Sequence, residues 1–315
     1  MPVTAEENEK YRVFVSEKAT EIGLFDFPSD KIVWHYTDGP GFLGIIQSSS
    51  LYATQVASLN DSSETKYATD LFKAAVQQVL DEKKDDETAR LFLQQVLEFV
   101  KDDPNAPTHG ISKFFVTCFS GEEDDPIQWD RYGKKNGYAI GFFARGLFRE
   151  ATSRLYKVVY DRERQQKVAK ELAEATLAFF LEGLHGERLK DPEQWAKDFY
   201  LAWDEWVYKL APLAKAPKWK AENEFRLVHE LTVSDFGRVQ FKQKETMLAR
   251  YLALATPAWV KRRTPLLPIA KVMIGPGNHA AFTRVSVMLL LEQMGYSTPA
   301  LTVPVEVTQT TLQRP

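Results

Sequence analysis

The chain has 315 residues, of which 44% are hydrophobic, 12% are aromatic and 26% are charged, and its formal net charge is −3. This composition is typical of a globular protein, and the charge excludes a surface that is basic throughout, which leaves nucleic acid only a local basic patch. The single cysteine, Cys118, excludes an internal disulfide and fits a reducing cytoplasm. The N-terminal segment lacks the apolar core of a signal peptide, and no apolar run approaches the roughly 18 residues of a membrane span. We therefore expect a cytoplasmic protein with no membrane partner.

The predicted elements do not alternate regularly between strand and helix. Residues 1–30 are expected to be an N-terminal lead-in without structure of its own. Apolar periodicity and turn residues predict strands over 31–37, 51–55, 113–120, 138–143, 155–160, 222–230, 237–243, 249–255, 269–276 and 301–309, and helices over 41–50, 64–83, 86–101, 162–186, 191–213 and 279–294. The irregular order favours one α+β domain over residues 1–315, with a helical lobe at 161–214 inserted before the strand at 222–230.

Several familiar kinds of site are missing from the sequence. The two stretches "GPGFLG" and "GPGN" have neither the P-loop lysine nor the glycine spacing of a dinucleotide-binding loop. The five histidines are scattered along the chain, and Cys118 has no cysteine or histidine cluster around it. We therefore expect no bound metal.

The stretch "KAENEFRLVHE" at 220–230 places Glu222, Glu224 and Arg226 at alternate positions of a predicted strand. Because a strand points successive side chains to opposite faces, these three side chains should share one face. That face is either solvated, with the charges serving only solubility, or it lines a site.

Three more stretches are unusually polar for their setting. One is the end of the first strand, another is the "LND" loop, and the third is "DDPIQWDRYGKKNGYAIGF", in which Gly133 and Gly137 would let the backbone approach a ligand closely. Each has a structural alternative, namely a satisfied histidine, a helix N-cap, and a turn with a packed tryptophan. The residues concerned are His35, Tyr36, Thr37, Asn60, Asp61, Gln128, Trp129, Arg131 and Tyr132.

Together these stretches resemble a bacterial family known as the domain of unknown function numbered 2971. The motifs that carry the resemblance are "WHYTDGPGFLGIIQSSSLYATQVASLNDSSE", "FVTCFSGEEDDPIQWDRYGKKNGYAIGF", "KWKAENEFRLV" and "IAKVMIGPGN". They extend from about residue 31 to residue 310, and Phe225 stands where the family pattern has tryptophan. The family label assigns no reaction.

A weaker resemblance is to the ADP-ribosyltransferase superfamily, whose layout has a strand-borne histidine, a following helix and a late Glu-x-Glu strand. It implies a mainly antiparallel sheet core and NAD as the substrate. In that case Glu224 would stabilise the oxocarbenium-like state beside the ribose, and Glu222 would orient the acceptor or take its proton. His35 would hold the other ribose in the same cleft as Glu224. The resemblance further implies stacking on nicotinamide by Trp129 or Tyr132, phosphate contacts by Arg131 or Arg226, and other NAD contacts by Tyr36, Thr37, Asn60 and Gln128.

The chain departs from the arginine-modifying branch of that superfamily. Its Ser-Thr-Ser strand is absent, and "FVTCFS", with Thr117 and Ser120, is only a loose substitute. The acceptor is therefore open. A toxin or an antiviral-defence effector, with an immunity or antitoxin protein as partner, is the role that the resemblance favours.

The rival interpretation is a module in phage defence that binds nucleic acid or protein without catalysis. The lobe ends in Lys215, Lys218, Trp219 and Lys220, and aromatic residues among lysines suit base stacking with phosphate contacts. The same group would serve a transferase whose acceptor is nucleic acid. An amphipathic helix with core tryptophans and solvated lysines is the structural alternative. A magnesium-dependent nuclease built on Asp61, Glu222 and Glu224 lacks any familiar spacing.

Overall fold

The structure is a computed structural model that describes residues 3–21, 31–58, 62–99, 113–134, 136–147, 153–200, 211–243, 248–255, 266–277 and 279–310. The chain divides into two compact units, each assembled from three separate stretches. Unit 1 comprises Met1–Asp26, Val56–Phe114 and Val158–Lys220, and unit 2 comprises Phe27–Gln55, Phe115–Lys157 and Ala221–Pro315. The predicted helical lobe is thus one part of a unit that also includes the N-terminal stretch.

Unit 2 is built on the sheet. The strand order is β10-β9-β4-β1-β3-β2-β8-β7, and β6 pairs with both β3 and β5. The described pairs are antiparallel except for β10 with β9, which is parallel. The strands are β1 Ile32–Thr37, β2 Ser50–Gln55, β3 Phe114–Ser120, β4 Tyr138–Phe143, β5 Ser153–Lys157, β6 Glu224–Glu230, β7 Gln240–Gln243, β8 Leu248–Ala255, β9 Ile269–Ile274 and β10 Val305–Val307.

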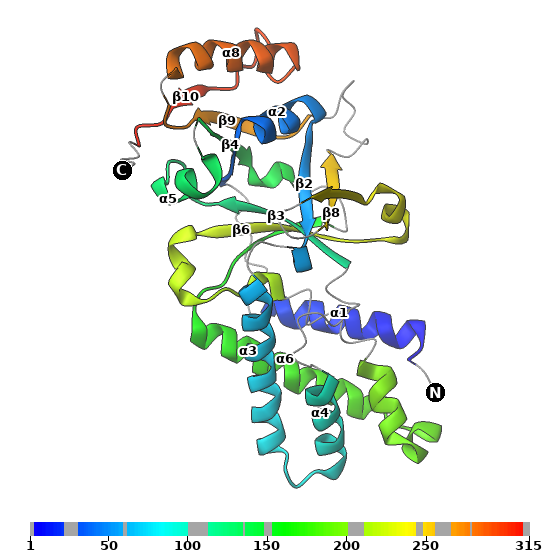
Figure 1. Ribbon diagram of the computed structural model, residues 1–315. Coiled ribbons are helices and arrows are strands. Elements are labelled where there is room, and N and C mark those ends of the chain that lie inside the picture. Colours follow the sequence, from blue (N-terminus) through cyan, green and yellow to red (C-terminus); the bar gives the residue numbers. More distant parts are fainter. Residues whose placement is uncertain are drawn as a thin grey trace. The chain divides into compact units, whose positions relative to one another are not determined.

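The helices of unit 2 are short apart from two. These two are α2 Gly39–Ser48 and α8 Ala280–Gln293, and Figure 1 shows α8 beside β10. Helix α2 begins where Asp38 accepts a hydrogen bond from the Gly41 backbone, and it ends at Ser49 in the left-handed region. The remaining turns are α5 Pro126–Gln128, the π-helical η3 Trp129–Gly133, η4 Ala144–Leu147 and η8 Val233–Arg238.

One hydrophobic cluster, here called the main core, lies on one face of the sheet. It contains Val33, Phe119, Ile140, Phe225 and Leu227, together with Phe42, Ile45 and Ile46 from α2 and Val287 and Leu291 from α8. A smaller cluster is formed by Trp34, Tyr36, Trp129, Ala139 and Met273. Because Val33 and Trp34 are consecutive in β1, these two clusters lie on opposite faces of that strand.

Unit 1 is helical. Its helices are α1 Ala5–Glu21, α3 Ser62–Glu82, α4 Glu87–Phe99 and α6 Arg162–Gly183, with a further helical stretch over 192–200 and the short turns η1 Val56–Ser58, η5 Gly186–Lys190 and η6 Ala211–Leu213. Figure 1 shows α3 and α4 as antiparallel neighbours joined by a tight turn. The hydrophobic core of unit 1 is rich in aromatic rings. Among them, Phe92 of α4 stacks on Phe180 of α6, with 4.1 Å between the ring centroids. The turn η7, Pro217–Glu222, spans the boundary between the units.

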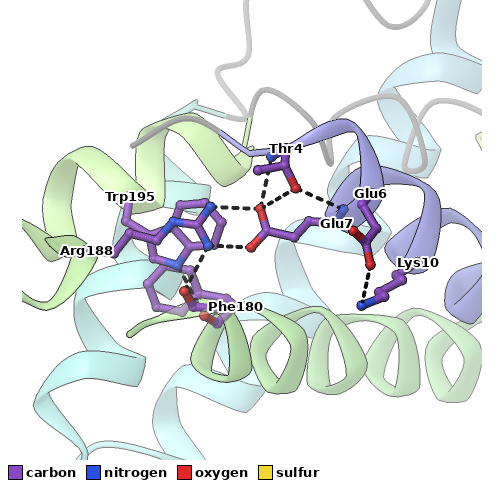
Figure 2. Close-up of polar contacts among 8 residues, drawn as sticks. Thr4, Glu6, Glu7, Lys10, Phe180, Arg188 and Trp195 are labelled. Carbon is purple, nitrogen blue, oxygen red and sulfur yellow. Dashed lines mark hydrogen bonds and ion pairs between the residues drawn. The ribbon is translucent and has the colours of Figure 1, made fainter. Parts of the chain in front are cut away.

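The N-terminal stretch corrects an expectation. Residues 5–21 form α1 rather than an unstructured lead-in. Thr4 and Glu7 cap the helix reciprocally, and the Glu7 carboxylate accepts two hydrogen bonds from Arg188, at 2.6 and 2.7 Å (Figure 2). The guanidinium carbon of Arg188 lies 3.7 Å from the centroid of the Trp195 ring. Composition alone does not predict this helix, because its many charged residues are equally typical of a solvated tail.

Where the structure describes them, the other predicted strands and helices agree with the observed elements to within a few residues. The α+β class with a mixed, mainly antiparallel sheet is confirmed. Strand β4 has its predicted bounds, whereas β5 begins at Ser153 rather than at 155 and ends at Lys157. The helix predicted over 191–213 is observed over 192–200, and residues 201–210 lie outside the described part of the chain.

Candidate functional site

The Glu-x-Glu segment is only partly a strand. Strand β6 starts at Glu224, whereas Glu222 ends the preceding turn and Asn223, with φ of 41°, separates the two. Glu224 and Arg226 therefore share a face of β6 as predicted, but alternation along a strand does not decide the direction of Glu222. All residues of β6 from Glu224 to His229 are buried, which rules out the solvated face, one of the two alternatives left open by the sequence.

Glu224 and Arg226 form a bidentate ion pair. Arg226 donates from Nε to Oε1 at 2.8 Å and from Nη2 to Oε2 at 2.9 Å. Two parallel N–H···O bonds of this kind fix the plane of the carboxylate as well as its position. Because the partners are two residues apart on one strand, this bond holds the carboxylate in place without joining distant parts of the chain.

Glu222 is ion-paired with Arg131, whose side chain comes from the π-helical turn η3. The carboxylate is nearly buried, with 7% of its side chain exposed, whereas the guanidinium is 39% exposed. Tyr132, the next residue in η3, is 45% exposed. The segment that the sequence singled out at 128–133 is thus brought to Glu222, and π-helical turns are frequent at functional sites.

Backbone and side-chain bonds fix the start of β6 against the end of β3. The Ser120 hydroxyl donates to the Glu222 carbonyl at 3.2 Å, and the Gly121 amide donates to the Asn223 carbonyl at 2.8 Å. The Asn223 side chain donates to the Glu122 carboxylate at 2.9 Å. Both carboxylates of the Glu-x-Glu segment are therefore held in defined positions, which a catalytic group requires.

Trp129 is part of the core and is completely buried, so it presents no ring face to a ligand. Its indole N–H donates to Asp124 at 2.6 Å, and Asp124 also accepts from the Gln309 amide at 3.0 Å. Burial acts to raise the pKa of Asp124, but the hydrogen bonds that it accepts from Thr308, Trp129, Gln309 and Thr310 together hold this pKa below its usual value. Of the two rings predicted to stack on nicotinamide, Tyr132 is the one that is accessible.

The glycines of this segment serve packing. A Cβ atom on Gly137 would lie 2.1 Å from the carbonyl oxygen of Gly133, and one on Gly133 would lie 2.8 Å from the Trp129 ring. The close approach that these glycines permit is between backbone and backbone or between backbone and indole. The structural alternative given for this stretch, a turn with a packed tryptophan, describes what is observed.

His35 does not meet Glu224. Its ring contacts that of Phe119 at 5.8 Å, on the face of β1 that carries the main core. Glu224 precedes Phe225, a main-core residue, and so points away from that core. The expectation that both side chains line one cleft is therefore wrong, because each strand turns the polar residue to a different face.

His35 has a distinct polar environment. Its Nδ1 donates to the Cys118 carbonyl at 2.9 Å, and burial lowers the pKa of the ring, which favours the neutral form. Trp34 with Ser120 is the one described backbone pair between β1 and β3. The bond from the His35 side chain to the Cys118 carbonyl is a further link between these two strands. Thr117 lies on the face of β3 that also carries Phe119. Its hydroxyl is buried and has no hydrogen-bond partner within the described chain.

The other residues predicted to contact NAD are dispersed. Tyr36 faces Trp129, donating to the Glu122 carbonyl at 2.8 Å, and burial raises the pKa of its phenol. Gln128 is buried, and Thr37 is half-buried on the face of His35. Asn60 and Asp61 lie outside the described residues. Within the described ranges no group of three or more potential metal ligands occurs.

The basic group at the end of the predicted lobe is only partly accessible. Lys218 and Lys220 are exposed, whereas Lys215 is buried. The Lys215 and Lys218 ammonium groups lie 5.7 and 5.2 Å from the centroid of the Trp219 ring. These residues belong to unit 1, whereas the carboxylates belong to unit 2.

Sequence reasoning missed Asn223 and Asp124. The positive φ of Asn223 separates the two glutamates, and asparagine is one of the few residues that adopt this conformation readily, so "EN" before a strand was a usable signal. Asp124 bonds residues 308–310, and nothing local to either segment indicates that contact.

Comparisons with known proteins identify one match. No curated protein and no solved structure matches the chain. None of the described helices is long and apolar enough to cross a membrane. A family model described as "Protein of unknown function (DUF2971)" matches residues 128–227. This stretch runs from the Gln-Trp motif to the Glu-x-Glu strand, and over it the chain is similar to that family, as its motifs predict.

Proposed function

We propose that the protein binds NAD and transfers its ADP-ribose to an acceptor, using the carboxylates of Glu224 and Glu222. The observation that carries this proposal is the pair of glutamates flanking Asn223, each ion-paired with an arginine, with the exposed Tyr132 directly following Arg131 in the chain. Fixed carboxylates can stabilise the positive charge that develops on the ribose as a nicotinamide–ribose bond breaks.

The roles follow from the charges that develop during the reaction. As the bond between C1′ and nicotinamide breaks, its electron pair leaves with nicotinamide and the ribose becomes positive; Glu224 stabilises that charge. The acceptor then attacks C1′, and Glu222 takes the proton that the acceptor loses. Arg131, which is partly exposed, contacts the pyrophosphate, and Tyr132 stacks on nicotinamide.

His35 has no place in this ribose site, because it points to the face of the main core. The proposal therefore rests on the carboxylates without the histidine that the superfamily layout would supply. This makes His35 a useful control, since its replacement should change NAD binding much less than replacement of Arg131.

The test is a titration of the full chain with NAD, followed by measurement of released nicotinamide. Glu224→Gln should reduce turnover by about 10²–10³-fold, the usual effect of removing a well-placed electrostatic group. Glu230→Gln, at the other end of β6, is the matched control and should leave turnover within about twofold of wild type. If wild type neither binds nor consumes NAD with any nucleic acid or protein present, the proposal fails.

A second candidate is a nucleic-acid-binding module without catalysis, supported by Trp219, whose ring centroid lies 5.7 and 5.2 Å from two lysine ammonium groups. The double variant Lys218→Ala with Lys220→Ala should bind single strands with a weaker salt dependence. The slope of log K against log salt concentration should become shallower by about 0.7–0.9 for each phosphate that a lysine no longer neutralises. Lys215 is left intact because it is buried. Binding with an unchanged salt slope would refute this function.

The biological setting that we propose is a cytoplasmic toxin or antiviral-defence effector. An enzyme that consumes NAD or modifies nucleic acid harms its own cell, so an immunity or antitoxin protein is the partner expected of it. Cells that express wild type should then lose viability or NAD, and cells that express Glu224→Gln should not.

A further inference from the structure

Helix α8 of unit 2 presents an apolar face to solvent. Its inner face packs on the main core through Val287 and Leu291. Its outer face carries Phe282, Val285 and Leu289, which are 77%, 57% and 61% exposed, with Met288 at 44%. The spacing of three, four and seven residues places these side chains on one stripe of the helix. An exposed apolar stripe of this kind marks an interaction surface.

The charges on α8 indicate what covers that stripe. Arg284 and Glu292 are the helix's two charged residues, and both are exposed. They lie four residues before and four residues after Met288, and their charges are opposite. If a second α8 packs antiparallel about a two-fold axis at Met288, Arg284 of each copy faces Glu292 of the other. A two-fold interface requires this self-complementarity.

We propose that the protein forms a two-fold symmetric dimer through antiparallel packing of α8 against α8 of a second copy. Phe282, Val285 and Leu289 of each copy fill the contact, and two reciprocal Arg284–Glu292 pairs fix its direction. Arg284 already donates through Nε to the Val305 carbonyl at 2.9 Å, which orients its side chain. Its terminal nitrogens can still reach a carboxylate.

The expected dimer is a weak one. A helix of 14 residues is about 21 Å long, so its stripe buries less than the roughly 800 Å² per partner of a standard interface. Exposed Leu301 and Val307 add apolar surface in the neighbouring segment that contains β10. We therefore expect a concentration-dependent equilibrium between monomer and dimer.

Sedimentation or light scattering of the full chain over a concentration series tests this inference. The mass should rise from 36.0 kDa toward twice that value as concentration increases. Leu289→Glu should keep the protein monomeric throughout. Phe236→Ser, which alters an exposed aromatic residue of η8, is the matched control and should leave the equilibrium unchanged. A wild type that remains monomeric, or a dimer that tolerates Leu289→Glu, would overturn the proposal.

A charge exchange tests the antiparallel direction. Arg284→Glu and Glu292→Arg should each weaken the dimer, because like charges then meet twice across the axis. The double variant should restore it, and mixing the two single variants should give a heterodimer stronger than either homodimer. Since Arg284→Glu also removes the bond to Val305, its melting temperature is measured alongside. If the double variant stays as weak as the single variants, the antiparallel pairing is refuted even when a dimer exists.

Discussion

Two bidentate carboxylate–arginine pairs, one in each unit, differ in what they connect. In unit 1, Glu7 of α1 binds Arg188 of η5, and 181 residues separate the partners (Figure 2). In unit 2, Glu224 binds Arg226 two residues further along the same strand. The first pair joins two elements that are distant in sequence, whereas the second joins two residues of one strand and orients a carboxylate. The same chemical contact is thus a tertiary clamp in unit 1 and a means of orienting a side chain in unit 2.

The largest expected effect on stability comes from breaking the clamp. Glu7→Gln removes the Glu7 carboxylate from the buried Arg188 guanidinium, and breaking a buried pair in this way typically costs about 3–5 kcal/mol. Because Glu7 is partly exposed, we expect the lower end of that range in urea unfolding. Glu6→Gln is the control, since its pair with Lys10 is exposed and should contribute less than about 0.5 kcal/mol (Figure 2). Equal effects of the two substitutions would refute the clamp.

In unit 2, the segment that contains Trp129, Gly133 and Gly137 is held by packing. Replacing a glycine there should therefore lower the free energy of unfolding. Gly137→Ala places a methyl group 2.1 Å from the Gly133 carbonyl, and forcing apart a packed site of this kind costs about 1–3 kcal/mol. Gly44→Ala in α2 is the control, because nothing lies within 4 Å of the new methyl group and alanine favours the helix by about 0.5–1 kcal/mol. The two variants should therefore shift the unfolding midpoint in opposite directions, and equal shifts would contradict this account of the glycines.

Replacing both partners of each pair should separate the two regions further. Glu224→Leu with Arg226→Met replaces both charged groups of one strand by hydrophobic side chains of similar volume, and such replacements are often neutral for stability, to within about 1 kcal/mol. Glu7→Gln with Arg188→Met should still destabilise unit 1, because it removes both the link between α1 and η5 and the stacking of the guanidinium on Trp195. Urea unfolding of the two double variants compares them directly. A larger destabilisation of the Glu224 and Arg226 variant would show that this pair, too, is a structural clamp.

The clamp should also depend on pH. The hydrogen bonds from Arg188 are the largest influence on Glu7 and lower its pKa from 4.5 to about 2. A carboxyl whose pKa is lower when folded stabilises the protein fully above its unfolded pKa. This contribution should disappear as the pH falls from about 4.5 to about 2. The difference in stability between wild type and Glu7→Gln should shrink over that window. A difference that is constant with pH would mean that Glu7 acts through packing alone.

The sequence predicted most of the strands and the long helices because their apolar periodicity is local. It failed at α1, whose amphipathicity is weak and whose attachment depends on Arg188, far away along the chain. For the site, the alternation pattern correctly placed Glu224 and Arg226 on one face. The binding roles of Arg131 and Tyr132 stay predictions. The sequence could not predict that His35 would face the main core, because the direction of a side chain depends on the register between β1, β3 and β6. Nor could it predict that Trp129 would be buried against Gly275, which is distant along the chain.

The structure of the full chain bound to NAD tests the central claim most directly. The proposed transferase predicts the nicotinamide ribose within hydrogen-bond distance of the Glu224 or Glu222 carboxylate, with the nicotinamide ring on Tyr132. NAD bound on the face of His35 and Thr117, away from both carboxylates, would contradict the account, and so would the absence of NAD at saturating concentration.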